Sequence, residues 1–255
     1  MKTAILLAAH GTADEEAGRD LDRVAARARE RFPGREIRWV HTSPAVRSAL
    51  VRRGRPAPSP GEVLAGLAGE GYGRVAVQTL HVVAGYDFER LARSLDKAPV
   101  RSVLGRPLLG SGSDLNRVAE AVLTELVPRR SPEEALVLMA HGTAHPAGSA
   151  YGKLGRILTR RDPGIFLGCL ENGPGIEGIR DEIAAQGLKQ ACLLPFLTLA
   201  GGHARRDLAG PGSKSWASVL SAAGLECRTV LKGLCRMGGV VEVWLDHLEA
   251  ALAEL

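Results

Sequence analysis

Two apolar runs of similar sequence dominate the hydrophobic pattern of the chain. Residues 4–9 run into His10, residues 135–140 run into His141, and Gly-Thr follows each histidine. Such a continuous apolar run is typical of a strand buried on both faces of a parallel sheet. Since open α/β sheets bind ligands at the carboxyl ends of their strands, both histidines are predicted to lie at the edge of a cleft. The repetition indicates a chain built from two similar halves.

In the rest of the chain, short apolar runs alternate with segments whose apolar residues have helical spacing, and both halves show this alternation. Strands are predicted at residues 3–9, 37–40, 75–80, 100–104, 135–140, 165–170, 191–197 and 227–231, with helices between them. This alternation predicts an α/β protein with two similar domains, each a four-stranded parallel sheet with helices on both faces. The stretch after Pro128 is rich in turn-forming residues, so we place the domains at 1–128 and 129–255, related by a pseudo-twofold axis.

An alignment of the halves pairs polar residues that follow corresponding strands. It places His10 on His141, His41 on Glu171 through Pro44 and Pro174, and Asp87 on His203 through Gly85 and Gly201. If the halves pack about the twofold axis, these six polar residues should line one cleft between the domains, where small ligands bind preferentially. A single histidine at a strand end is often only a hydrogen-bonding partner for a loop, but the matched positions favour a functional site.

Other polar residues have simpler interpretations. His145 is expected at the surface or in a supporting position, His247 is expected to be structural, and Glu89 is expected to be solvated on a helix. Arg205 and Arg206 could form a solvated face or could bind substrate carboxylates.

Composition narrows the class of protein. The formal net charge of +5 weakly favours anionic partners, and no strip of basic and aromatic residues predicts nucleic-acid binding. No apolar segment is long enough to span a membrane, and the short apolar N-terminus is better explained as a strand than as a signal peptide, so we expect a cytoplasmic protein. The four cysteines form no C-x-x-C pair, which argues against a disulfide framework or a cysteine metal site.

Two imidazoles and a carboxylate suit proton transfer near neutral pH and the binding of divalent zinc, cobalt, nickel or iron. The chain has no G-x-S-x-G nucleophile elbow and no P-loop motif, and no glycine fingerprint for a dinucleotide follows the first strand. These absences disfavour acyl transfer, nucleotide hydrolysis and dinucleotide chemistry.

At three segments the sequence resembles the class II chelatases, and within them the anaerobic cobalt chelatases of the CbiK type. The segments are residues 77–85, 139–142 and 194–203, and the resemblance extends over the whole chain. It implies the two-domain fold and ATP-independent insertion of Co²⁺ into sirohydrochlorin during cobalamin synthesis. Sirohydrochlorin would be the partner, Co²⁺ would be the substrate metal with Fe²⁺ or Ni²⁺ as alternatives, and the oligomeric state stays open, a homo-oligomer included.

The resemblance also implies residue roles. His141 would accept the pyrrole protons and contact the metal, and His203 would be the second metal histidine. Asp87 falls where the family usually carries glutamate, so it is the expected carboxylate ligand, with Glu89 as the alternative. We expect substrate contacts from three further residues, His10, His81 and Glu171.

Three competing functions remain. A histidine at position 10 is common in members related to siroheme synthesis, so a sirohydrochlorin ferrochelatase is one alternative. A non-catalytic carrier of tetrapyrrole or metal is the second. A periplasmic binding protein is the third, disfavoured because no signal peptide is recognised.

Overall fold

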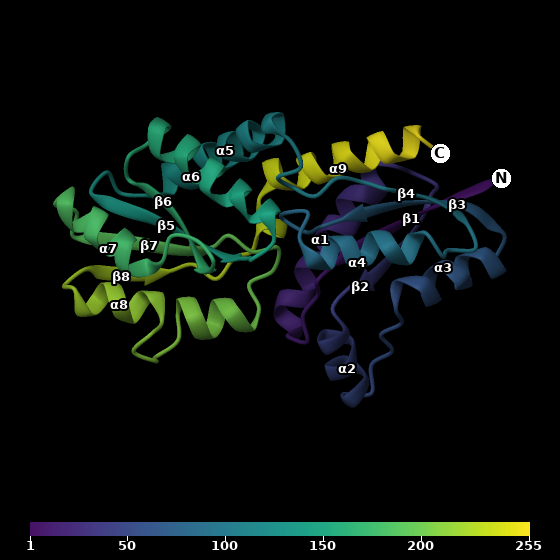
Figure 1. Ribbon diagram of the computed structural model, residues 1–255, viewed down its shortest axis with the longest axis horizontal. Coiled ribbons are helices and arrows are strands. Elements are labelled where there is room, and N and C mark those ends of the chain that lie inside the picture. Colours follow the sequence, from purple (N-terminus) through teal and green to yellow (C-terminus); the bar gives the residue numbers. More distant parts are fainter. The chain divides into compact units, whose positions relative to one another are not determined.

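The computed structural model describes residues 1–255 and divides into two compact units (Figure 1). Unit 1 contains Met1–Gly110 and Val240–Leu255, and unit 2 contains Ser111–Gly239. Each unit holds one four-stranded parallel sheet, with strand orders β2-β1-β3-β4 and β6-β5-β7-β8. The predicted α/β class, with two similar parallel sheets, is confirmed.

Strands and helices follow a similar order in both halves of the chain, except that the first half has two helices between its second and third strands and the second half has one. The first half comprises β1 (Lys2–Ala9), α1 (Glu15–Arg31), β2 (Glu36–His41), α2 (Pro44–Arg52), α3 (Pro60–Gly69), β3 (Tyr72–Thr79), α4 (Tyr86–Leu95), β4 (Arg101–Leu104) and α5 (Gly112–Leu126). The second half comprises β5 (Glu134–Gly142), α6 (Ser149–Arg161), β6 (Ile165–Glu171), α7 (Ile176–Ala185), β7 (Gln190–Pro195), α8 (Trp216–Ala222), β8 (Glu226–Thr229) and α9 (Gly238–Ala253). A π-helical turn, η3 (Ala204–Leu208), follows β7.

The compact units differ from the predicted division at residue 128, because the last helix of each half joins the other unit. Helix α5 belongs to unit 2, where Arg161 of α6 forms a 2.7 Å ion pair with Glu120 of α5. Most of helix α9 belongs to unit 1, where Arg27 of α1 forms a 2.6 Å ion pair with Glu242 of α9. Each sheet is therefore completed by a helix from the opposite half of the chain.

Strand register tests the alignment of the halves. The amide of Leu80 donates to the carbonyl of Ala8, and the amide of Phe196 donates to the carbonyl of Met139, both at 2.7 Å. His10 and His141 each lie two residues after these carbonyls, and Asp87 and His203 each lie seven residues after these amides, which confirms both pairings.

The pairing of His41 with Glu171 is wrong. Ala9 pairs with His41 in the first sheet, and its counterpart Ala140 pairs with Cys169 in the second. His41 therefore corresponds to Cys169, and the Pro44–Pro174 anchor is displaced by two residues.

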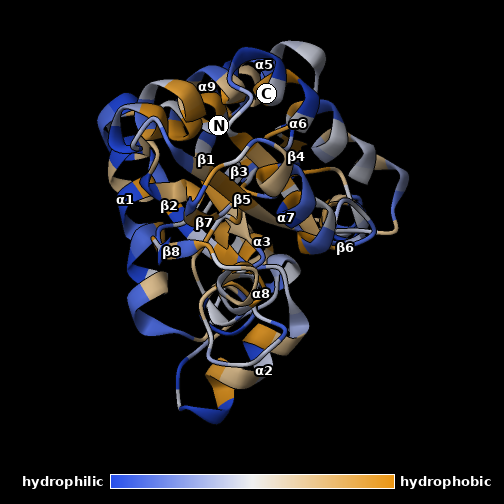
Figure 2. Cartoon of the chain, turned by 90° about the vertical axis from the view of Figure 1, so that its left-hand side faces the viewer, coloured by the Kyte–Doolittle hydropathy of each residue, from blue (hydrophilic) through white to orange (hydrophobic).

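The cores lie on the sheets, whose strands carry much of the hydrophobic colour in Figure 2, whereas α1 is largely hydrophilic on its outer side. In β1, residues 4–9 are all fully buried, as expected for a strand covered on both faces. A capping box begins α3, since Ser59 and Glu62 exchange side chain–backbone hydrogen bonds. No helix of the structure is both long enough and apolar enough to cross a lipid bilayer.

Candidate metal and proton-transfer site

The candidate residues lie at the point where the strand order of each sheet reverses. In unit 1 the chain moves from β1 outward to β2 and then returns to β3 on the other side of β1; β5, β6 and β7 repeat this path in unit 2. The carboxyl ends of strands at such a reversal form a natural ligand crevice. Residues 10 and 87 follow β1 and β3, and residues 141 and 203 lie at the equivalent ends of β5 and β7.

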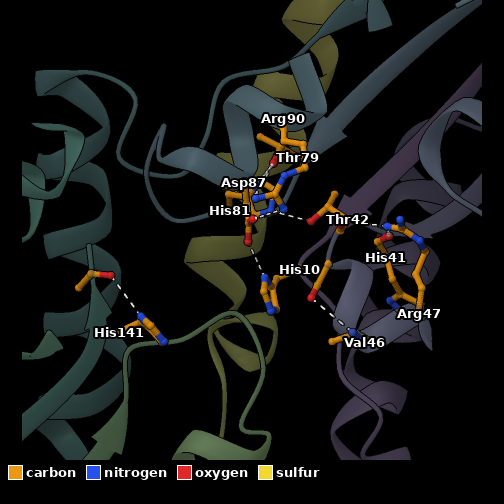
Figure 3. A network of polar contacts seen from close by, with 12 residues as sticks. His10, His41, Thr42, Val46, Arg47, Thr79, His81, Asp87, Arg90 and His141 are labelled. Atoms are coloured by element: carbon orange, nitrogen blue, oxygen red, sulfur yellow. Dashed lines mark hydrogen bonds and ion pairs between the residues drawn. The ribbon is translucent and has the colours of Figure 1, made fainter. Parts of the chain in front are cut away.

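In unit 1 this arrangement brings His10 and Asp87 together (Figure 3). The Nδ1 atom of His10 lies 2.7 Å from Oδ2 of Asp87, and the other carboxylate oxygen accepts a 2.8 Å hydrogen bond from Arg90. The hydrogen bond from His10 is the main reason that the pKa of Asp87 falls to about 2. Asp87 is thus an ionised acceptor. It binds Nδ1 of His10, so Nε2 is the ring nitrogen that is not used in this contact.

In unit 2 the equivalent positions bring together His141 and His203. Their ring centroids are 4.7 Å apart and the rings are nearly perpendicular, at 87°. Nδ1 of His141 lies 3.2 Å from the carbonyl oxygen of Gly142, its hydrogen-bond acceptor. If Nδ1 carries the hydrogen, Nε2 presents a lone pair that can bind a metal ion or accept a proton.

The orientation of His203 depends on a residue that the sequence analysis missed. Asp207, one turn later in η3, places Oδ2 2.7 Å from Nδ1 of His203. Arg206 also approaches this nitrogen, at 3.3 Å, but its closest contacts are with Asp207. These contacts with Arg206 are the main cause of the lowered pKa of Asp207. An ionised Asp207 selects the tautomer of His203 with hydrogen on Nδ1, which leaves Nε2 for a metal.

His81 is placed differently from the prediction. Its side chain is buried, with Nε2 3.0 Å from the hydroxyl of Thr42 and Nδ1 2.7 Å from that of Thr79 (Figure 3). Burial lowers its pKa to about 4, so the ring is neutral at physiological pH. Both ring nitrogens of His81 have partners, and the contact with Thr42 joins the loop after β3 to the segment after β2, which leaves little of the side chain exposed for a substrate contact.

The other expected residues are distributed as follows. Glu171 is the exposed last residue of β6, and His247 is buried with Nδ1 3.1 Å from the carbonyl of Arg106, which confirms its structural role. Glu89 pairs with Arg93 on the surface of α4. His41 ends β2, with a buried Nδ1 that has no partner. All four cysteines are free, and Cys169 and Cys192 are buried. No three His, Cys, Asp or Glu side chains are grouped as a metal site.

Two solved structures that share this architecture come from proteins of siroheme metabolism or metal binding. SirB from Bacillus subtilis with Fe³⁺ superposes with a TM-score of 0.70 at 17% identity, covering 100% of this chain and 97% of that one. CbiX, described as the terminal enzyme for siroheme biosynthesis in denitrifying bacteria, gives a TM-score of 0.59 at 18% identity, covering 97% and 99%. The two parallel sheets with matched strand-end histidines therefore define a protein of the class II chelatase fold.

Sequence comparison identifies the family. The model of the cobalt chelatase (CbiK) family matches residues 3–253, so the chain belongs to this family. A sirohydrochlorin cobaltochelatase CbiKC of Nitratidesulfovibrio vulgaris (strain Hildenborough) is 38% identical across 100% of this chain and 92% of its own length. A sirohydrochlorin cobaltochelatase of Salmonella typhimurium is 30% identical across 86% and 84%.

Proposed function

We propose that this chain inserts Co²⁺ into sirohydrochlorin without ATP, as a lyase of the anaerobic cobalamin pathway in the cytoplasm. The two relatives described above are named sirohydrochlorin cobaltochelatases, and the family match spans nearly the whole chain. The observation that carries the proposal is the pair His141–His203, two imidazoles 4.7 Å apart at the sheet's strand-order reversal.

The incoming metal ion is a substrate that must be bound and then released. We propose that His141 and His203 bind Co²⁺ through their Nε2 atoms, because Nδ1 of each ring already has an acceptor partner. Imidazole suits divalent cobalt, and two protein ligands leave positions open for water and for the macrocycle. Asp87 is the proposed carboxylate contributor, since each of its oxygens keeps a lone pair beyond those used by His10 and Arg90.

Insertion releases two protons, because Co²⁺ replaces the hydrogens on two pyrrole nitrogens. We propose that Nε2 of His141 becomes free when Co²⁺ passes to the macrocycle, and that it then accepts the displaced pyrrole protons one at a time and releases each to solvent, which its part-buried position at the end of β5 permits. Neutral imidazole can accept the proton without leaving an unpaired negative charge in the site. No phosphoryl transfer is needed, in agreement with the missing P-loop.

Substrate contacts are assigned to the exposed polar residues at the same strand ends. His10, oriented by Asp87, and the exposed Glu171 keep their proposed contact with the macrocycle, whereas His81 acts indirectly by fixing the loop that leads to Asp87. Sirohydrochlorin is a polycarboxylate, which suits the net charge of +5.

The direct test is anaerobic incubation of the protein with sirohydrochlorin and Co²⁺, followed by the absorbance change of the macrocycle. Parallel reactions with Fe²⁺ and Ni²⁺ rank the metals. The fastest turnover with Co²⁺ is expected; faster turnover with Fe²⁺ would favour the ferrochelatase reaction, which the histidine at position 10 also supports. Binding of sirohydrochlorin without insertion of any metal would favour a carrier.

A further inference from the structure

A cavity with both apolar and polar walls lies in unit 2, on the side of β5 that faces β6 and away from β7. It has a volume of about 430 Å³ and lies between the loop that follows β5 and the loop that follows β6, with the start of α6 as its third wall. This volume is in the range of small-molecule sites. Its first lining residue, Thr143, is two residues after His141 and therefore no more than about 7 Å along the chain from it.

Tyr151 gives the cavity its most specific feature. The side chain lies on α6, lines the cavity, and is only 5% exposed. Its hydroxyl is not among the fully buried polar atoms that lack a partner, so the oxygen stays accessible to a group bound in the cavity. Burial also raises the pKa of Tyr151, which keeps the group a hydrogen-bond donor at physiological pH. The group that completes this site should therefore be an acceptor.

The other polar groups around the cavity are also neutral. Ser149 and Asn172 contribute an exposed hydroxyl and an exposed amide, and no Lys, Arg, Asp or Glu lines the cavity. Nδ1 of His145 accepts the amide of Ala147, so the neutral ring carries its hydrogen on Nε2. Gly173 keeps the wall thin, since a Cβ atom there would lie 2.8 Å from Sγ of Cys169.

Neutral donors without a competing acid fit a carboxylate, which forms strong charge-assisted hydrogen bonds to such groups. We propose that this cavity binds one carboxylate-bearing side chain of the tetrapyrrole and that the Tyr151 hydroxyl donates to it, an inference that rests on the proposed function. The cavity begins at Thr143, just after His141. The loop after β5 could therefore bind the edge of the macrocycle while His141 faces the pyrrole nitrogens. Tyr151 is then a specificity-determining residue for the acid side chains of the substrate.

The test is equilibrium binding of metal-free sirohydrochlorin to the full chain and to Tyr151→Phe, which removes only the hydroxyl. Affinity should fall about tenfold, the usual size for a hydrogen bond to a charged group. Affinity for the methyl-ester derivative of sirohydrochlorin, which carries no carboxylates, should change by no more than about threefold. Tyr72→Phe is the matched control, because Tyr72 lies in β3 of unit 1 and should leave both affinities unchanged.

The outcomes separate this inference from the proposed function. Cobalt insertion by the wild type together with unchanged acid binding by Tyr151→Phe would overturn the carboxylate site and leave the chelatase function intact. Equal weakening of acid and ester binding would also overturn it, because the hydroxyl would then act on the fold and not on the charge. Absence of sirohydrochlorin binding by the wild type would overturn both. Ser149→Ala, at an exposed position, is a second variant and should weaken acid binding in the same selective way.

Discussion

Asp207 offers the sharpest test of how the protein prepares His203 for a metal. Its Oδ2 lies 2.7 Å from Nδ1 of His203, within the range of a charge-assisted hydrogen bond. In Asp207→Ala this acceptor is gone, and the Arg206 guanidinium, 3.3 Å from the same nitrogen, remains as a donor. Because a donor favours a lone pair on Nδ1, the hydrogen should shift to Nε2 and block the proposed metal position.

Removal of such a supporting carboxylate typically lowers metal affinity by about 10- to 100-fold, or about 1.4 to 2.7 kcal/mol. We expect a loss in this range for Co²⁺ binding to Asp207→Ala, measured anaerobically by competition with a chromophoric chelator. Asp207→Asn retains an oxygen acceptor and should lose less. Asp181→Ala is the control, since this exposed aspartate in unit 2 pairs only with its neighbour Arg180.

Wild-type cobalt affinity in Asp207→Ala would refute the reasoning. So would an equal loss in Asp181→Ala, since that would indicate an effect of net charge and not of ring orientation.

Two further predictions concern stability. Burial lowers the pKa of His81 in the folded chain to about 4, so between about pH 4 and 6.5 the unfolded chain binds more protons than the folded chain. The contribution of His81 to the free energy of unfolding, up to roughly 3 kcal/mol, is therefore present above pH 6.5 and is lost as the pH falls toward 4. Chemical denaturation of wild type and His81→Gln across this window should show a steeper pH dependence for the wild type, and parallel curves would contradict the assignment. Gly142→Ala should lower the free energy of unfolding by more than about 2 kcal/mol, because φ is +80° and the new Cβ would lie 1.7 Å from the carbonyl oxygen of Glu171. Gly178→Ala, with open space around it, should be nearly neutral in the same assay, and equal stability of the two variants would argue against a required glycine at position 142.

The repeated hydrophobic pattern was sufficient to predict both sheets and the main site pairings. It worked because β1 and β5 are buried on both faces, so their runs are long and uninterrupted, and because glycines mark equivalent turns. Gly71 and Gly187 both adopt positive φ, at 85° and 70°. Pro44 and Pro174 follow corresponding strands, but the strand pairing shows that they are offset by two residues. Aligning the halves on these prolines therefore gave the wrong partner for His41.

Other features depend on tertiary contacts that a sequence pattern does not contain. An amphipathic helix such as α5 or α9 has a clear apolar face, but its pattern does not state which sheet that face covers. His81 resembled a site residue, but its side chain is buried and contacts the hydroxyl of Thr42, which follows another strand, β2. Asp207 could have been noticed from its position four residues after His203, a spacing that places two side chains on one helical face.

The most direct test of the central claim is the rate of cobalt insertion by His141→Ala at saturating sirohydrochlorin. If Nε2 of His141 accepts the pyrrole protons and contacts the metal, the rate should fall about a hundred- to ten-thousand-fold, while the affinity for metal-free sirohydrochlorin stays close to that of the wild type. Insertion within about threefold of the wild-type rate would contradict the account, because the histidine at the end of β5 would then be dispensable for the chemistry.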